Sequence, residues 1–413
     1  MLNKYSLIIS TFAVATVLIS PTIIGSLQGA KSVYAQTFPG FLPAQSPTTY
    51  QQKVQQYDKE KNCAIDQQMN DTNYKTYLTH FACGHVTVLA NGTTLRQFTL
   101  IINDYHGTGV PIVISSIVPG LGKPIAEGSY KPVIFHAWTF NDTVPGPTMR
   151  FTQGDHLQIK VINSQESEFP HSLHMHSMHP GPIDGMSGLA GMIEPGKSFT
   201  YNFIAQPAGV YPYHCHMFPV QEHISRGLYG MMIIDPQNPR PQATEMVMML
   251  NSYSYSFQGV NGSGHLTPTL PATMQQIQAN LSDVTEASDE NNGPDNQFYS
   301  VNGMPFGYVG SDSVHLTAGK PYRIYLANMV EFDPVNSFHM HGNMFYYTPS
   351  ATPDSAKMYT DIVTLGQGDR GMLEFKYPFP GQFMFHAHIN HFSDLGWIGF
   401  FNVTKQAGPF FSQ

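Results

Sequence analysis

Residues 209–216 read Gly-Val-Tyr-Pro-Tyr-His-Cys-His, and residues 381–388, which lie 172 positions later, read Gly-Gln-Phe-Met-Phe-His-Ala-His. In both stretches a glycine precedes alternating aromatic residues, and the run ends in a His-X-His triplet. Alternation with a period of two is typical of a β-strand with one buried face. The sequence therefore predicts two related strands, each with a pair of histidines at its end.

A second pair of matching stretches shows that the repeat extends beyond one strand. Residues 152–163 contain a Thr-Gln-Gly-Asp turn, alternating apolar residues and a final asparagine, and residues 317–328 repeat this pattern 165 positions later. A repeat at a fixed offset indicates two copies of one structural unit. Short alternating strands separated by turns predict an all-β fold, with two tandem Greek-key β-sandwich domains.

The repeat predicts the domain boundaries. We expect a first domain over residues 79–235 and a second over 236–404, because residues 236–241 read Pro-Gln-Asn-Pro-Arg-Pro and form a proline-rich linker. Residues 36–78 are a polar lead-in to the first domain. Residues 405–413 form a C-terminal tail.

The N-terminus has the composition of an export signal. A lysine precedes an apolar run over residues 7–24, and small residues then lead to a cleavage site after Ala35. We therefore predict a signal peptide over residues 1–35 and a secreted or cell-surface protein; an uncleaved anchor is the alternative, because the run is nearly long enough to span a bilayer. In that location a disulfide between Cys63 and Cys83 is expected.

The overall composition argues against one broad class of function. Charged residues make up 12% of the chain, the formal net charge is −8, and no basic block is present. Nucleic-acid binding depends on a basic surface, so we predict no nucleic-acid partner.

The histidines are concentrated in a few short runs. The chain contains 19 histidines, and ten of them belong to these runs: His171, His174 and His176; His214, His216 and His223; His339 and His341; His386 and His388. A His-X-His triplet on a strand places both imidazoles on one face. Four such triplets at repeat-related positions predict a multinuclear metal site, because eight imidazoles buried without a metal would be costly to desolvate.

Cys215 indicates that the metal is copper. It lies between two of these histidines, and His171 upstream and His223 downstream complete the trigonal set of two imidazoles and one thiolate that binds blue copper. Such sites usually have a weak axial methionine, but Leu228 occupies that position here. Leucine cannot coordinate copper, which favours Cu(I) and a higher potential; Met231 is a weaker axial candidate.

The second repeat keeps only part of this set. Asn336 stands where the repeat predicts a counterpart of His171, and Ala387 stands where it predicts a counterpart of Cys215. Both His-X-His triplets remain. This selective retention indicates that the eight-histidine set has a function separate from the blue-copper site.

These motifs resemble those of the multicopper oxidases. The resemblance rests on His-X-X-His-X-His over residues 171–176, on His-Cys-His…His…Gly-Leu over 214–228, and on residues 137–148, which resemble the family's first domain. It covers roughly residues 98–404 and is greatest with the two-domain, laccase-like group of archaeal type. It implies cupredoxin-like domains and a homotrimer in which clusters form between subunits.

Position by position, the resemblance implies four copper ions per chain: one type-1, one type-2 and two type-3. The type-1 ion would be bound by His171, Cys215 and His223. The type-2 ion would be bound by His174 and His339. The type-3 pair would be bound by His176, His214, His216, His341, His386 and His388. Electrons would pass from Cys215 to the cluster through the flanking His214 and His216.

The implied function is that of a laccase-like oxidoreductase with O2 as acceptor. A small molecule or metal ion would be oxidised at the type-1 copper, and O2 would be reduced to water at the trinuclear cluster. His223 lies eight residues after Cys215, further than is usual in the family, so the insertion at 217–220 leaves the identity of the reductant open.

Two other functions are alternatives. Copper nitrite reductases share the two-domain trimer, but they typically have Asp in place of His174 and a non-histidine in place of His216. A non-catalytic extracellular copper-binding protein is the second alternative, although storage of copper does not require a Cys-His redox site.

Overall fold

The computed structural model describes residues 63–64, 74–107, 109–114, 133–186, 191–254, 296 and 298–411, and all of them belong to one compact unit. The predicted signal peptide and most of the lead-in lie outside these residues. Within this part of the chain, no helix is long and apolar enough to cross a membrane.

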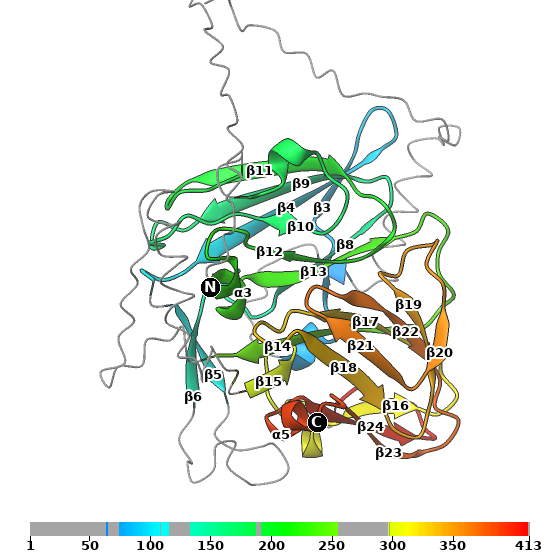
Figure 1. Cartoon of the computed structure of the whole chain (residues 1–413). Coiled ribbons are helices and arrows are strands. Elements are labelled where there is room, and N and C mark those ends of the chain that lie inside the picture. The colour runs from blue at the N-terminus through cyan, green and yellow to red at the C-terminus, as the bar shows by residue number, and fades with distance from the viewer. Residues whose placement is uncertain are drawn as a thin grey trace, which may run out of the picture. The chain divides into compact units, whose positions relative to one another are not determined.

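The strands of the first repeat form two main sheets, drawn from blue to green in Figure 1. One sheet has the order β1-β2-β8-β13-β12-β10; the other has the order β11-β9-β4-β3, and β7 pairs with β4. The strands of the first repeat are β1 (Cys63–Ala64), β2 (Phe81–Ala82), β3 (His85–Val88), β4 (Thr94–Asn103), β7 (Thr139–Phe140), β8 (Gly146–Thr152), β9 (His156–Asn163), β10 (His174–Met175), β11 (Ser198–Ile204), β12 (Gly209–His214) and β13 (Tyr229–Asp235). A separate two-stranded sheet is made of β5 (Val110–Ile114) and β6 (Val133–Ala137).

The second repeat is built in the same way. Its sheets have the orders β15-β14-β17-β22-β19-β20 and β16-β24-β23-β18-β21. The strands are β14 (Thr244–Tyr253), β15 (Phe298–Val301), β16 (Val314–Thr317), β17 (Tyr322–Asn328), β18 (Val335–Met340), β19 (Phe345–Pro349), β20 (Met358–Thr360), β21 (Ile362–Gly366), β22 (Arg370–Phe375), β23 (Gly381–His386) and β24 (Ile398–Thr404). The prediction of an all-β Greek-key fold is confirmed.

Helical segments are few and short among the described residues. They are α2 (Tyr74–Tyr77), η1 (Gly181–Ile183), α3 (Val220–Ser225), η3 (Gly310–Asp312) and α5 (Asn390–Asp394). Two of them follow the histidine-bearing strands at corresponding places: α3 comes after β12 and carries His223, and α5 comes after β23.

The matching stretches of sequence form the predicted strands. Strands β9 and β17 begin just after the two related turns, and β12 and β23 end at His214 and His386. The alternating apolar side chains of β9 and β17 lie in the two sandwich cores, where they are almost fully buried. Burial of one strand face accounts for the period of two in the sequence.

Cys63 lies on a strand that pairs with the strand leading to Cys83, its predicted disulfide partner. Strands β1 and β2 are parallel, and Cys63 pairs with Phe81, two positions before the buried Cys83. The disulfide itself stays a prediction.

A third apolar cluster and a buried ion network join the two repeats. The cluster combines residues such as Val210 and Met231 with Val247 and Tyr325. The division between residues 235 and 236 stays a prediction; β13 ends at Asp235 and β14 begins at Thr244.

Arg150 lies at the centre of the ion network. Its guanidinium is fully buried and lies 2.7 Å from carboxylate oxygens of both Asp235 and Glu245, and Arg323 lies 2.8 Å from Glu245. The network therefore fixes the first strand of the second repeat to the last strand of the first.

We predict that Arg150→Ala lowers the free energy of unfolding by about 3 kcal/mol, because two buried carboxylates lose a partner. Denaturant unfolding monitored by circular dichroism measures this loss. Lys357→Ala is the matched control, because Lys357 is 54% exposed beside Glu374 and its removal is expected to cost less than about 1 kcal/mol. Equal effects of the two substitutions would contradict this account.

Candidate metal centres

The histidine triplets stand on neighbouring antiparallel strands. His174 of β10 lies opposite His214 of β12, and His339 of β18 lies opposite His386 of β23. The paired imidazole rings are 5.2 Å apart in the first repeat and 5.4 Å apart in the second, measured between centroids. The strand register therefore gathers four imidazoles around the ends of two neighbouring strands in each repeat.

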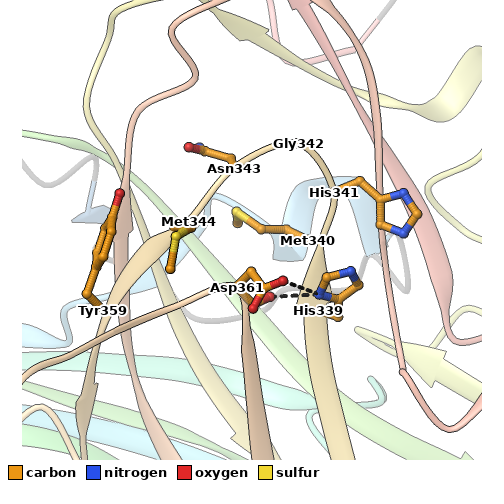
Figure 2. A pocket seen from close by; sticks show the side chains of 8 residues that line it. All are labelled: His339, Met340, His341, Gly342, Asn343, Met344, Tyr359 and Asp361. Atoms are coloured by element: carbon orange, nitrogen blue, oxygen red, sulfur yellow. Dashed lines mark hydrogen bonds and ion pairs between the residues drawn. The ribbon is translucent and has the colours of Figure 1, made fainter.

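The first histidine of each set is oriented by a backbone carbonyl. His174 Nδ1 lies 2.8 Å from the carbonyl oxygen of Asp184, and His339 Nδ1 lies 2.9 Å from that of Asp361. Such a bond places the proton on Nδ1 and leaves Nε2 as the metal ligand. Figure 2 shows Asp361 beside His339, with His341 close to it.

The next two histidines of each set point at one another. His176 Nε2 lies 3.1 Å from His214 Nε2, and His341 Nε2 lies 3.1 Å from His386 Nε2. Nitrogen ligands about 2 Å from one metal ion lie about 3 Å apart. These two pairs therefore have the spacing of imidazoles that share an ion.

The carbonyl oxygen of the following residue orients the middle histidine of each set. His214 Nδ1 lies 2.9 Å from the carbonyl oxygen of Cys215, and His386 Nδ1 lies 2.7 Å from that of Ala387. Both rings therefore turn Nε2 toward the shared space. The two repeats use the same hydrogen bonds for the same purpose.

Two serines hold the last histidine of each set. The backbone N–H of His216 donates to Ser172 Oγ at 3.1 Å, and that of His388 donates to Ser337 Oγ at 2.9 Å. These serines were not predicted from the sequence. They occupy equivalent positions in the repeat at an offset of 165, which is a signal that was available.

Burial favours the neutral form of three imidazoles in the first repeat. Desolvation lowers the pKa of His174, lowers that of His176 to about 4, and lowers that of His214 well below its usual value; neighbouring histidine charges act in the same direction. The neutral imidazole is the form that binds a metal. Burial also lowers the pKa of His341 and His386 in the second repeat.

The two four-histidine sets remain separate within the chain. Among the described residues, every group of side chains with metal-binding spacing takes its histidines from one repeat only. The set in the second repeat borders an open pocket of about 710 Å³ that Met344, Tyr359 and Asp361 also line (Figure 2). Each repeat therefore holds its own four-histidine set, which we call a half-site.

A third group lies in the core of the first repeat. His171, Cys215 and His223 are all buried; Cys215 Sγ lies 3.7 Å from His171 Nδ1 and 3.2 Å from His223 Nδ1. Burial opposes ionisation of the thiol, but the charges and hydrogen bonds of both histidines outweigh it and hold the Cys215 pKa well below its usual value. A thiolate is the form that binds copper.

Buried Asp104 orients His171. Its carboxylate oxygen Oδ2 lies 3.1 Å from His171 Nε2, and the carboxylate also accepts backbone N–H groups from Gly107, Glu168 and Phe169. The ligand nitrogen is therefore Nδ1. Asp104 was not predicted from the sequence, because it lies 67 positions before His171 and outside the stretches that repeat.

The two residues considered for the axial position of the blue-copper site, Leu228 and Met231, lie in different apolar clusters. Leu228 lies in the same core cluster as Cys215, and its carbonyl oxygen accepts the Cys215 N–H at 3.0 Å. Met231 lies in the cluster between the repeats. Met217, from the insertion after the cysteine, is also buried in the Cys215 cluster.

The donor atoms fit copper. One thiolate and two imidazole nitrogens converge in a dry core, which suits a blue-copper ion. In each half-site two imidazoles have their Nδ1 atoms hydrogen-bonded to backbone carbonyls, which leaves Nε2 free to bind further copper ions. A fourth group, made of His174, His179 and Asp184, fits less well. Asp184 Oδ1 already lies 2.9 Å from His179 Nε2, and the backbone carbonyl of Asp184 orients His174.

We predict that Asp104→Asn lowers the stability of the copper-free protein by roughly 3 kcal/mol at neutral pH, because an amide group replaces a multiply bonded buried carboxylate. Burial opposes the charge of Asp104, but His171 and backbone N–H groups outweigh it and lower its pKa. This stabilisation is present above the ordinary pKa of Asp and is lost as pH falls through the lowered value.

Unfolding titrations at several pH values test this prediction. The difference between wild type and Asp104→Asn shrinks in acid. The exposed Asp354→Asn is the control and leaves stability unchanged. A constant difference across the pH range would contradict the assigned role of the carboxylate.

Comparisons with known proteins show the family of the chain. Two family models, both described as multicopper oxidase, match residues 128–239 and 270–407. A crystal structure of a multicopper oxidase is 37% identical, covers 80% of this chain and 96% of its own, and has a TM-score of 0.63. Copper nitrite reductase from Nitrosomonas europaea is 24% identical with a TM-score of 0.56; it covers 77% of this chain and 97% of its own and shows a shared fold.

Curated relatives include a copper-containing nitrite reductase and a copper resistance protein. Copper-containing nitrite reductase from Neisseria meningitidis is 26% identical over 280 residues, which are 67% of this chain and 66% of the relative. Copper resistance protein A from Escherichia coli is 38% identical over 122 residues, 29% of this chain and 19% of the relative. The chain thus spans just under two thirds of the first relative and a fifth of the second. It belongs to the multicopper oxidase family.

Proposed function

We propose that this chain is a laccase-like oxidase. A reductant gives up electrons one at a time at the Cys215 site, and O2 is reduced to water at the eight-histidine site. The observation that carries the proposal is the selective loss in the second repeat, which lacks the cysteine site but keeps four histidines with the same hydrogen bonds as the first.

Four copper ions per chain supply the redox chemistry in this proposal, and the protein fixes their positions. His171, Cys215 and His223 would hold the type-1 ion, and the eight histidines would hold the other three. Cys215 lies in the core, whereas its neighbours His214 and His216 border the cavity of the first half-site. This arrangement gives electrons a short covalent path from the buried thiolate to the imidazoles.

We further propose that the oxidase is a homotrimer. A half-site has only four histidines, and the two halves do not form a joint group within the described chain. In the second half-site, His341 and His388 are exposed. A neighbouring copy can complete each site, because a head-to-tail contact that closes into a ring uses every half-site once.

Nitrite reduction is the second candidate, and the similarity to copper nitrite reductases over 67% of the chain is the observation that favours it. Two residues argue against it. His174 and His216 both belong to the first half-site, and nitrite reductases typically lack a histidine at each of these positions. Anaerobic nitrite consumption, compared with oxygen uptake on the same reductant, distinguishes the two functions.

The proposed site of action is outside the cytoplasm. The apolar run over residues 7–24 and the small residues up to Ala35 support export. The physiological reductant, a small molecule or a metal ion, would meet the type-1 site there.

We predict that Cys215→Ser abolishes the blue absorption and reduces oxygen uptake by several orders of magnitude, because a hydroxyl replaces the thiolate through which electrons enter. Visible spectroscopy and an oxygen electrode measure these effects. Lys405→Ala is the control, since Lys405 is exposed and lies outside the three centres; it retains the blue colour. Full oxidase activity in Cys215→Ser would refute electron entry at this site.

We predict that two inactive variants restore each other's activity when mixed. His174→Ala disables the first half-site and His339→Ala the second. Joint unfolding and refolding with copper would return about a quarter of the wild-type oxygen uptake, because a quarter of the sites between chains then combine two intact halves.

Each variant refolded alone is the control and stays inactive, whereas wild type regains its activity. A mixture that stays inactive, although wild type recovers, would show that the site is not shared between chains.

A further inference from the structure

The first half-site faces a cavity with a wall that comes from the second repeat of the same chain. The cavity has a volume of about 650 Å³; four histidines of the first repeat line it, and Met329, Glu331, Gln367 and Gly368 line it from the second repeat. Glu331 is the one carboxylic acid in this lining. It follows strand β17 and is 6% exposed.

Glu331 is held in place from two sides. Asn296 Nδ2 donates to its carbonyl oxygen at 2.7 Å, and Gln367 Nε2 donates to its carboxyl oxygen Oε1. Gly368, which follows Gln367 in the chain, packs against the half-site. A Cβ atom built on Gly368 would lie 3.4 Å from His176 Cε1. The loop that anchors the carboxyl group is thus in contact with a histidine of the site.

The surroundings of Glu331 favour a protonated acid. In the described part of the chain, no lysine or arginine forms an ion pair with it. Burial raises the pKa of Glu331 to about 7, and only the hydrogen bond from Gln367 opposes this effect. The neighbouring Asp333 accepts from Asn296 and Tyr299, and the charge of Arg370 acts on His176.

We propose that Glu331 is the proton donor for the oxygen that is reduced in this cavity, an inference that rests on the proposed oxidase function. The reaction is O2 + 4 e⁻ + 4 H⁺ → 2 H2O, and its electrons come from the reductant oxidised at the Cys215 site. In each transfer, an O–H bond of the Glu331 carboxyl breaks and an O–H bond to the reduced oxygen forms. A proton from bulk solvent, relayed by water in the cavity, then reprotonates the carboxylate.

Asp184 and Asp361 are the other acids near the half-sites, and both are already engaged. The carboxylate of Asp184 is bonded to His179 Nε2 at 2.9 Å, and that of Asp361 lies 3.7 Å from His339 Nδ1 and is 52% exposed. Glu331, by contrast, has one hydrogen bond to its carboxyl group and faces the cavity. Glu331 is therefore the acid in the described chain that is best placed to exchange protons there.

The test is Glu331→Gln in the full copper-loaded protein, because glutamine keeps the shape and the bond to Gln367 but carries no acidic proton. The fully reduced protein is mixed with O2, and the return of the blue absorption is followed. We expect this step to slow on the order of a hundredfold, whereas copper content and anaerobic reduction of the blue centre stay unchanged. Asp333→Asn removes a nearby carboxylate outside the cavity lining and serves as the matched control.

The pH profile separates proton donation from a structural role. In wild type the acid form declines as pH rises through about 7, so reoxidation slows over this range; Glu331→Gln lacks this dependence. A wild-type rate and pH profile in Glu331→Gln would overturn the role of Glu331. An inactive wild type would instead overturn the proposed function.

A second measurement is independent of copper. Infrared difference spectra of the copper-free protein are expected to show a protonated carboxyl band that titrates near pH 7 and is missing in Glu331→Gln. If that band is absent from wild type at pH 6, the assignment is overturned, whatever the variant does in turnover.

Discussion

The whole arrangement depends on the register between two pairs of antiparallel strands. His174 must lie opposite His214, and His339 opposite His386, for the imidazoles to converge. A slip of one residue would turn every side chain of a strand to the other face. The apolar residues that alternate along these strands fill the cores, so the hydrophobic packing of each sandwich also sets the geometry of its half-site.

The same alternation separates the two groups of candidate metal ligands in the first repeat. Cys215 points into the core beside Leu228, whereas His214 and His216 point toward the cavity. The proposed electron-entry site is therefore buried, and Cys215 is the immediate sequence neighbour of the half-site histidines His214 and His216. In the second repeat Ala387 occupies the corresponding core position, so that repeat lacks the thiolate but keeps its four histidines.

The sequence allowed the all-β fold and the histidine strands to be predicted, because both follow from local alternation and from the repeat. The residues it did not reveal act over long distances in the chain. Asp104 reaches His171 across 67 positions, and Glu331 reaches the cavity of the first repeat from the second. Neither residue stands in a motif, and only the packing of strands from different parts of the chain brings it to its site.

The number of copper ions per chain tests the central claim most directly. Metal analysis of the copper-loaded protein is combined with visible and electron paramagnetic resonance spectra. The account predicts four ions per chain, with a blue band, a type-2 resonance and a near-ultraviolet shoulder from a coupled pair. Two ions per chain, with blue and type-2 signals only, would contradict it and would favour a nitrite reductase.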